Sequence, residues 1–425
     1  MMVEKHSLSP KGSVLAALDI GSSKISCFIG RMIDDSGGFE LIGVGNRPSQ
    51  GVKNGVIVDL EEAEKAIRQT VHLAENMAAD VMKGYPLREV IVNVSGVCAK
   101  SYGHRVEVGV NGHEVTENDV RRALASAQQK EMSEDLELIH TIPTFFTLDE
   151  QEGIRDPRGM VADHMKVDIN LVTGDANVLR NVASCIERSH LDISALCVNS
   201  YASGLSSLVN DEVDLGCTVI DIGGGTTSFA VFHSGYMIFC DAFAIGGKHV
   251  TSDIAKGLTT SIEHAERLKT LYGSAMASQT DENEMIDVVK LGEDERSGHS
   301  HVPRSYLVGI MQPRLEEVFE MVRARLDDSG LSKIIGRRVV ITGGGSQISG
   351  IKDLAEHVMD KQVRLAKPIR LEGLPDAVSG PAFSTVAGLL IYAAHHAHEM
   401  PAEIMARVEP ESVLDRAKLW LRENW

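Results

Sequence analysis

The sequence predicts an α/β protein of two lobes, and three observations indicate this. The chain has 425 residues, which is more than one hydrophobic core usually holds. Apolar runs that end in glycine-rich turns recur along it, as short buried strands do. Segments with apolar residues at helical spacing separate these runs. We further expect a small α+β block inserted in the first lobe and a short amphipathic helix near the C-terminal end.

The bulk composition is that of a globular protein, with 43% apolar and 24% charged residues. The formal net charge of −18 predicts that the body of the protein repels nucleic acid and anionic membranes, so we expect no nucleic-acid partner. The N-terminal segment lacks the apolar core of a signal peptide, and the apolar run Val386–Ala394 is too short to cross a bilayer. The six cysteines include no Cys-x-x-Cys pair, which predicts reduced thiols in an intracellular protein.

The first lobe is predicted to begin with strands and turns over residues 14–58. A helix follows, with Asp59 as its N-terminal cap and apolar residues on one face. After a strand near residues 88–94, a second helix follows the cap Asp175. Residues 191–208 are then typical of a strand that leads into a helix of small residues, which allows two lobes to pack closely.

Residues 95–172 form the predicted inserted block. Strands are expected near residues 105–110, 137–148 and 167–173, with a helix capped by Thr116. This alternation within a short segment predicts a separate small α+β subdomain between two parts of the first lobe.

The second lobe is predicted to open with a strand at Cys217. A helix follows within residues 264–273, and a polar stretch after it holds one candidate strand at residues 284–291. A long helix is expected over residues 305–326, where Pro313 predicts either a kink or a later start.

The stretch Val219–Ser228, VIDIGGGTTS, combines a strand end, a carboxylate, three glycines and three hydroxyls. Glycine lets the backbone approach a ligand closely and reach positive φ, and the N–H groups and hydroxyls of such a turn can hold an anion. This combination favours a phosphate ligand, and an ordinary tight hairpin is the alternative. The candidate residues are Asp221, Gly223, Gly224, Gly225, Thr226 and Thr227.

Two more copies of this layout favour the phosphate interpretation. The stretch LDIGSSKIS contributes Asp19, Gly21, Ser22 and Ser23. The stretch VVITGGGSQISG has Thr342 in place of the acid and continues with Gly343, Gly344, Gly345 and Ser346. None of the three is a P-loop or a dinucleotide fingerprint. Asp19 and Asp221, on two facing hairpins, would hold Mg²⁺ mainly through its waters, because this ion dehydrates reluctantly.

Two polar clusters allow both a structural and a functional interpretation. Glu266 and Lys269 lie three residues apart on one helical face, so they form either a solvated ion pair or a contact surface for a ribose and an adenine. His395, His396 and His398 follow the last apolar run. Cations suit a helix C-terminus, and without a supporting carboxylate or cysteine framework a metal site there is the less favoured interpretation.

The stretch from Ser412 to Trp425 follows a linker with two prolines and several acids. Both tryptophans of the chain lie in it, beside apolar residues and flanked by bases, which favours a bilayer interface over a protein groove. A helix of about 14 residues is roughly 21 Å long, so it can lie on a membrane without crossing it. The residues on its apolar face are Val413, Leu414, Ala417, Trp420, Leu421 and Trp425.

The motifs and their order along the chain resemble those of the actin/sugar-kinase/chaperone ATPase superfamily. The features that carry the resemblance are the two Asp-Gly hairpins, the small-residue helix, the stretch AERLK and the third glycine turn. The inserted block, the stretches GGKHVTSDIA and GPAFSTVAGLL, and the tryptophan-bearing tail further resemble FtsA, a family of bacterial cell-division proteins, over nearly the whole chain.

The resemblance implies a protein that binds ATP with Mg²⁺ between its lobes and polymerises into actin-like filaments. It implies attachment by the C-terminal helix to the lipids on the inner face of the cytoplasmic membrane, at the division site. The C-terminal peptide of FtsZ would dock on the small subdomain of the second lobe, and later division proteins would contact the inserted subdomain. The first two turns would meet phosphate and metal, Glu266 and Lys269 the adenosine, and the third turn would back the base.

On this basis the chain divides into six parts. These are 13–94 with 173–215 as the first-lobe core, 95–172 as the inserted subdomain, 216–231 with 311–394 as the second-lobe core, 232–310 as its small subdomain, 395–411 as a linker and 412–425 as the membrane-targeting helix.

One position departs from the related shape-determining actins, in which a glutamate positions the attacking water. The equivalent residue here is Asn199, at the start of the small-residue helix. An amide cannot accept a proton as a carboxylate does, so we expect at most weak ATPase activity. The rival interpretations are a pilus-assembly-type actin-like ATPase and a small-molecule (sugar) kinase, neither of which accounts for the tail.

Overall fold

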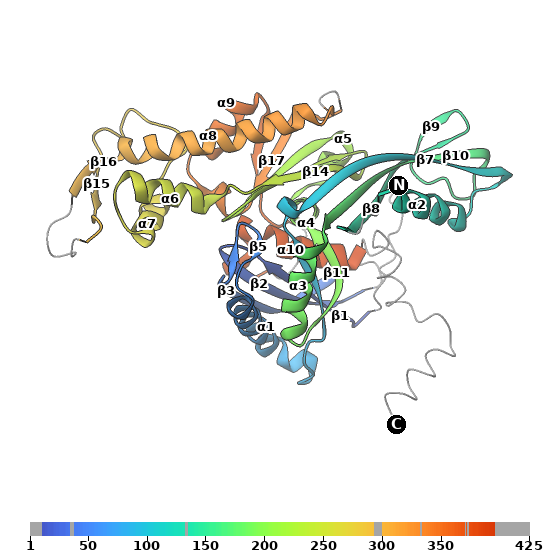
Figure 1. Cartoon of the computed structure of the whole chain (residues 1–425), viewed down its shortest axis with the longest axis horizontal. Helices are drawn as coiled ribbons and strands as arrows, with labels where there is room; N and C mark the ends of the chain where they lie inside the picture. Colours follow the sequence, from blue (N-terminus) through green and yellow to red (C-terminus); the bar gives the residue numbers. More distant parts are fainter. Residues whose placement is uncertain are drawn as a thin grey trace.

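The fold was analysed in a computed structural model, which describes residues 11–34, 38–131, 135–292, 300–331, 334–369, 371 and 374–395. Two lobes, each built on a five-stranded sheet, carry two smaller blocks at their outer ends (Figure 1). This confirms the predicted α/β class with two lobes and an inserted subdomain. Of the predicted linker (395–411) and terminal helix (412–425), residue 395 is described and is the last residue of a helix, and residues 396–425 lie outside the described residues.

The first lobe is a sheet in the order β11-β6-β1-β2-β3, with helices on both faces. Strands β1 to β3 are antiparallel, whereas β6 and β11 run parallel to β1. The elements are β1 (Val14–Ile20), β2 (Lys24–Met32), β3 (Phe39–Pro48), the short pair β4 (Val52–Lys53) and β5 (Val56–Ile57), α1 (Leu60–Met82), β6 (Glu89–Val94), α3 (Ala176–Arg188), β11 (Asp192–Val198) and α4 (Asn199–Ser207).

The second lobe repeats the same plan in the order β14-β13-β12-β17-β18, again with three antiparallel and two further parallel strands. The elements are α5 (Asn210–Leu215), β12 (Cys217–Ile222), β13 (Thr227–His233), β14 (Tyr236–Phe243), α8 (Arg304–Asp328), β17 (Arg338–Thr342), the short helix η2 (Gly344–Gln347), α9 (Ile351–Met359), β18 (Gln362–Leu365), the short helices η3 (Asp376–Val378) and η4 (Pro381–Phe383), and α10 (Ser384–His395).

The two sheets and their helices form five layers. Helices α1 and α3 cover the outer face of the first sheet, and α8 and α9 cover the outer face of the second. Helices α4 and α10 lie between the sheets, in one continuous apolar core. Because side chains alternate along a strand, Ala17 and Val219 point to this middle layer, and so do Asp19 and Asp221, two residues further along.

The middle layer is packed closely enough to restrict its residues. A Cβ atom on Gly388 of α10 would overlap the carbonyl group of Ala202 in α4. The hydroxyl of Ser206 donates to the carbonyl oxygen of Ser384 at 2.7 Å. Both helices are buried on nearly all sides, which explains why α10 is apolar all round and α4 is built of small residues.

The inserted subdomain is a four-stranded sheet in the order β7-β10-β8-β9 with one helix against it and a core of its own. It also touches β14, at the edge of the second-lobe sheet. Its elements are the short helix η1 (Gly96–Cys98), β7 (Ala99–Glu114), α2 (Glu117–Glu131), β8 (Leu136–Leu148), β9 (Gln151–Ile154) and β10 (Val161–Asp175).

The small subdomain of the second lobe lies at the opposite end (Figure 1). It contains α6 (Gly247–Gly257), α7 (Ile262–Tyr272), β15 (Met285–Val288) and β16 (Ser300–Pro303). Because β14 is a strand of the core sheet, the boundary placed at residue 232 moves to after Phe243. Helix α8 begins at Arg304 and continues through Pro313, so the proline does not delay the start of the helix.

The predicted helix caps Asp59 and Asp175 are confirmed. The Asp59 carboxylate accepts hydrogen bonds from the backbone N–H groups of Glu61 and Glu62, both at 3.1 Å. Asp175 accepts from Asn177 at 2.9 Å and from Val178 at 3.2 Å. Each cap satisfies N–H groups that the first turn of a helix leaves without a partner.

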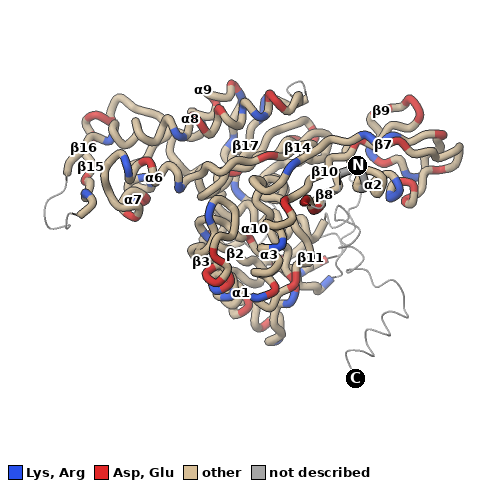
Figure 2. Tube along the Cα trace, viewed as in Figure 1, with Lys and Arg blue, Asp and Glu red and all other residues tan. Residues whose placement is uncertain are grey.

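Basic and acidic residues are mixed over the lobes and over both outer blocks (Figure 2). Several of them pair across the surface, as Arg105 does with Asp168 at 2.7 Å. Among the described residues, none of the helices is long and apolar enough to cross a membrane.

We predict that Gly388→Ala destabilises the protein strongly. The new methyl group has no free space between α10 and α4, so the two helices must separate, and overpacking of this kind costs about 2–4 kcal/mol of the free energy of unfolding. Urea denaturation followed by circular dichroism measures this loss.

Gly309→Ala in α8 is the matched control. It is exposed, with no atom within 4 Å of the added Cβ, so the higher helix propensity of alanine should raise stability by about 0.5–1 kcal/mol. Equal denaturation midpoints for the two variants would contradict the close contact of α4 and α10.

Candidate functional site

The three glycine turns meet at one cleft of about 1270 Å³ between the lobes. The first turn joins β1 to β2, the second joins β12 to β13, and the third follows β17. Nearly all predicted binding residues line this cleft; they are Asp19, Gly21, Ser22, Ser23, Asn199, Asp221, Gly223, Gly224, Gly225, Thr226, Glu266, Lys269, Gly343, Gly344 and Gly345.

The first two turns touch each other directly. A Cβ atom on Gly224 would overlap the Ser23 hydroxyl, and one on Gly225 would lie 2.6 Å from the Ser22 hydroxyl. Lys248, at the start of α6, donates from Nζ to the carbonyl oxygen of Ser22 at 2.6 Å. Glycine is therefore needed here for the close approach of two backbones.

Asp221 is held by the two middle-layer helices. The hydroxyls of Ser203 in α4 and Thr385 in α10 both donate to its Oδ2, the latter at 3.0 Å, and the two hydroxyl oxygens lie 3.0 Å apart. Burial raises the pKa of Asp221, and these hydroxyl donors and Lys24 partly offset the rise. The carboxylate is thus fixed in orientation but short of positive charge.

Asp19 and Lys24 share the first-lobe side of the cleft. Burial raises the pKa of Asp19 to about 7, Lys24 opposes the rise and Asp221 adds to it. Burial lowers the pKa of Lys24 to about 8, against the attraction of both carboxylates. The Lys24 Nζ atom lies 2.9 Å from the centre of the Phe383 ring, and among the described residues it has no hydrogen-bond partner. A buried cation without an acceptor suits an anionic ligand.

Glu266 and Lys269 form more than a solvated ion pair. The Lys269 ammonium donates to Glu266 Oε2 at 2.7 Å, to Thr251 Oγ1 at 2.8 Å and to the carbonyl oxygen of Gly247 at 3.1 Å. This ties α7 to α6 and leaves Glu266 half-exposed along the cleft. The third turn also lines the cleft, and its Gly343 has φ +85° and lies directly against Asp221.

Two predicted residues do not face the cleft. The Thr227 hydroxyl is buried and donates to the carbonyl oxygen of Ile245 at 2.8 Å. The Ser346 hydroxyl is buried and donates to the carbonyl oxygen of Gly343 at 2.8 Å. The Ser346 bond closes the third turn, whereas the Thr227 bond joins the second turn to the loop after β14. These two hydroxyls therefore bond within the fold and do not line the cleft.

Asn199 does line the cleft, as the first residue of α4. Its Oδ1 accepts a hydrogen bond from Asn93 Nδ2 at 3.1 Å, and Asn93 Oδ1 accepts from the backbone N–H of Ile20 at 2.6 Å. The amide is thus oriented by β6 and β1, and it offers no group that could act as a general base.

The donor set suits a hydrated divalent cation better than a fully protein-bound one. Among the described residues there is no group of three or more His, Cys, Asp or Glu side chains that could hold a metal. Two carboxylates beside a ligand phosphate are what Mg²⁺ uses while keeping most of its waters. Of the histidine cluster, His396 and His398 lie outside the described residues.

The sequence analysis missed several residues that build the cleft. They are Lys24, Ser203, Lys248, Thr251 and Thr385. Lys24 lies in the stretch LDIGSSKIS and Lys248 in GGKHVTSDIA. A basic residue close to glycines in these stretches could therefore have predicted both lysines as cleft residues. Ser203 and Thr385 carry no local signal, because they reach Asp221 only once the two helices lie between the sheets.

Two family models match the chain. One, described as "Cell division protein FtsA", covers residues 218–388, and the other, described as "SHS2 domain inserted in FTSA", covers residues 96–173. The cell division protein FtsA of Rhizobium meliloti (strain 1021) is 40% identical over 98% of this chain and 96% of its own. That of Bacillus subtilis (strain 168) is 33% identical over 94% and 88%, and that of Escherichia coli (strain K12) is 30% identical over 97% and 98%.

Two solved structures are similar in fold. The PilM–PilN type IV pilus biogenesis complex matches with a TM-score of 0.62 at 16% identity, over 89% of this chain and 98% of that one. MreB5 of Spiroplasma citri, solved with ADP, matches with a TM-score of 0.52 at 16% identity, over 90% and 97%. At this identity the likeness shows the actin-like fold alone.

The raised pKa of Asp19 predicts a pH-dependent stability. The folded protein binds a proton on Asp19 that the unfolded chain has lost, so stability falls as the pH rises from about 4 to about 7. Asp19→Asn removes this loss and should be more stable than the parent at pH 8, on the order of 2 kcal/mol.

Denaturation midpoints between pH 4 and pH 8, without nucleotide, measure this effect. The two proteins should converge near pH 4, where Asp19 is neutral in the folded protein and partly so in the unfolded chain. A stability difference that stays constant over this range would show that Asp19 does not titrate near pH 7.

Proposed function

The chain belongs to the FtsA family of cell-division proteins, and from this premise we propose that it is an ATP-gated filament protein that tethers FtsZ to the cytoplasmic membrane at the division site. The observation that carries the nucleotide part is the meeting of three glycine turns and two carboxylates at one cleft. The FtsZ and membrane parts rest on the small subdomain and on the terminal sequence.

The cleft offers complementary groups to each part of ATP. The N–H groups of the first two turns, together with Lys24, provide the positive environment that phosphates need. Asp19 and Asp221 would hold Mg²⁺ through its waters, and the ion would supply neutralisation of phosphate charge. Glu266 and Lys269 would contact the adenosine, with Gly344 and Gly345 behind the base.

Hydrolysis in this cleft should be weak. Asn199 stands where a general base or water-positioning carboxylate is expected, and its Oδ1 is already engaged by Asn93. The protein would therefore change its assembly state mainly with nucleotide binding and release. We infer an assembly protein with at most weak ATPase activity.

The small subdomain presents a surface suited to an apolar peptide. Met285 on β15, Leu291 after it and Tyr306 at the start of α8 are between 53% and 68% exposed. Exposed apolar side chains within one subdomain are candidates for a protein-binding surface. We propose that the C-terminal peptide of FtsZ docks here, remote from the inserted subdomain.

The terminal sequence is proposed to attach the protein to the inner face of the membrane. Its apolar face carries both tryptophans of the chain, flanked by Arg416, Lys418 and Arg422, a composition that suits the lipid interface. An anchor this short binds weakly, so stable attachment calls for many copies in a filament. Self-association and membrane binding would then reinforce each other, and the inserted subdomain is left to contact later division proteins.

The two rival functions are less well supported. The likeness to the pilus complex is one of fold, at 16% identity, whereas FtsA proteins share 30–42% identity with this chain over most of its length. A sugar kinase needs a carboxylate free to activate a hydroxyl. Asp221 is bonded to Ser203 and Thr385, and Asp19 is buried beside Lys24.

We predict that Asp221→Ala weakens Mg-ATP binding by at least about 100-fold, or about 2.7 kcal/mol. The variant should fold, because the hydroxyls of Ser203 and Thr385 remain within hydrogen-bond distance of each other. Isothermal titration calorimetry measures the affinity.

Thr227→Val, on the other side of the same glycine turn, is the matched control. It removes a hydroxyl that bonds within the fold, so stability should fall by about 1 kcal/mol while the ATP affinity stays within about twofold. Asp221→Ala protein that binds Mg-ATP as tightly as its parent would rule out the proposed cleft.

A vesicle-pelleting experiment tests the tether. FtsZ polymers should pellet with anionic vesicles only when this protein carries residues 412–425, because that segment supplies the lipid contact. Trp420→Ala should lower the pelleted fraction several-fold, whereas Leu419→Ala, off the apolar face, should change it little. With Tyr306→Ala, the protein should pellet and FtsZ should stay in the supernatant.

Each arm of this experiment can fail separately. Unchanged pelleting after truncation would refute the membrane role of the tail. Unchanged recovery of FtsZ with Tyr306→Ala would refute the proposed docking surface on the small subdomain.

A further inference from the structure

We propose that His140, a residue of the inserted subdomain, is a positioning residue of the nucleotide cleft. It acts through α4 and α10 to hold Asn199 and Asp221 in place, so the inserted subdomain takes part in forming the Mg²⁺ side of the site. This inference rests on the proposed nucleotide function.

His140 lies on β8 and is fully buried between the two middle-layer helices. Its Nε2 accepts a hydrogen bond from the backbone N–H of Val198 at 3.1 Å. A neutral ring that accepts at Nε2 carries its proton on Nδ1, so Nδ1 donates to Tyr392 Oη at 3.2 Å. The ring is therefore held in one orientation, with the first contact at Val198, where β11 leads into α4, and the second at α10.

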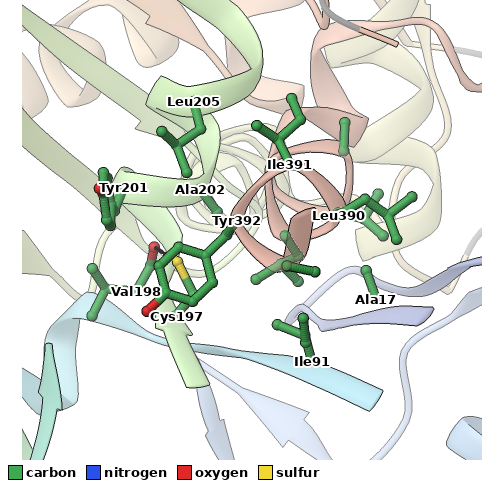
Figure 3. Close-up of a cluster of buried hydrophobic side chains, with 14 of the residues drawn as sticks. Ala17, Ile91, Cys197, Val198, Tyr201, Ala202, Leu205, Leu390, Ile391 and Tyr392 are labelled. Carbon is green, nitrogen blue, oxygen red and sulfur yellow. Dashed lines mark hydrogen bonds between the residues drawn. The ribbon is translucent and has the colours of Figure 1, made fainter. Parts of the chain in front are cut away.

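Aromatic contacts strengthen this junction. The His140 ring meets the rings of Tyr201 and Tyr392 edge-on, each with centroids 5.4 Å apart, and these two tyrosines lie 5.9 Å from each other. Figure 3 shows Tyr392 of α10 beside Val198 and Cys197, where β11 leads into α4. One strand of the inserted subdomain is thus joined to both helices at a single place.

The α4 side of the junction leads directly into the cleft. Val198 precedes Asn199, which lines the cleft and bonds to Asn93. One turn later, Ser203 donates to the Asp221 carboxylate. Asn93 itself lies on β6, three residues before η1, where the inserted subdomain begins, so the strand that leads into the subdomain also contacts Asn199.

The α10 side leads to the same carboxylate. Thr385 lies seven residues before Tyr392, about 10.5 Å along one face of the helix, and it donates to Asp221 at 3.0 Å. The overlap that a Cβ on Gly388 would make with Ala202 shows that α4 and α10 are in direct backbone contact, so we treat the two helices as one packed block. A shift of this block at His140 therefore displaces both donors of Asp221.

The polar ring is informative because the surroundings are apolar. Ile142, Val172 and Leu205 belong to the same core, and burying an imidazole there is unfavourable unless its nitrogens are bonded. A phenylalanine would fill the space without setting an orientation. The two directed hydrogen bonds therefore define how β8 sits against the α4–α10 block.

Calorimetry of ATP binding, with Mg²⁺ and with EDTA, tests this role in the full-length protein. His140→Phe keeps the bulk and removes both hydrogen bonds. We expect the gain in affinity that Mg²⁺ provides to fall about tenfold or more, while metal-free ATP affinity stays within about twofold. His140→Gln, which can both donate and accept, should restore part of the gain.

Ile142→Val is the matched control on the same strand. Ile142→Val should lower the denaturation midpoint and leave the Mg²⁺ gain unchanged. If His140 had a purely structural role, His140→Phe would give the same result. A full Mg²⁺ gain in His140→Phe overturns the inference, whereas a parent protein that binds no ATP overturns the proposed function instead. If His140→Phe does not fold, Tyr392→Phe replaces it: a reduced Mg²⁺ gain supports the inference and an unchanged gain overturns it.

Discussion

Two buried carboxylates at the ends of equivalent strands are the constraint on which the rest of the structure depends. Asp19 and Asp221 end the central strands β1 and β12 and point into the layer between the lobes. Burial makes their ionised forms unfavourable and raises the pKa of both. Hydroxyl donors and Lys24 offset this only in part, so the cleft is set up to gain from a metal ion and an anionic ligand that arrive together.

The middle layer turns this local constraint into a link between lobes. Helix α4 follows the last strand of the first-lobe sheet, and α10 follows the last strand of the second. A hydroxyl from each helix donates a hydrogen bond to the Asp221 carboxylate. The close contact of the two helices requires glycine at position 388. Because both helices are buried, neither has the polar face of a surface helix. The relative position of the lobes and the geometry of the cleft are thereby set by the same atoms.

The surfaces proposed for partners lie away from this layer, at opposite ends of the molecule (Figure 1). The small subdomain joins the cleft through α7, whose Lys269 bonds to α6, and the inserted subdomain joins it through His140. In a cell-division protein of the FtsA family, this arrangement places the proposed nucleotide site between the two proposed partner-binding surfaces.

The sequence by itself determined what local chemistry controls. Period-two and helical apolar patterns, the caps Asp59 and Asp175, and the glycine turns predicted the strands, the helices and most cleft residues, because each follows from a few neighbouring residues. Only the tertiary structure decided that the Thr227 and Ser346 hydroxyls bond to backbone carbonyls and do not line the cleft, and that Lys24 lies near both carboxylates. It also decided that Ser203 and Thr385 donate to Asp221 and that His140 contacts Val198 and Tyr392. Those side chains are far apart in the chain, and their contacts exist only once both sheets close on α4 and α10.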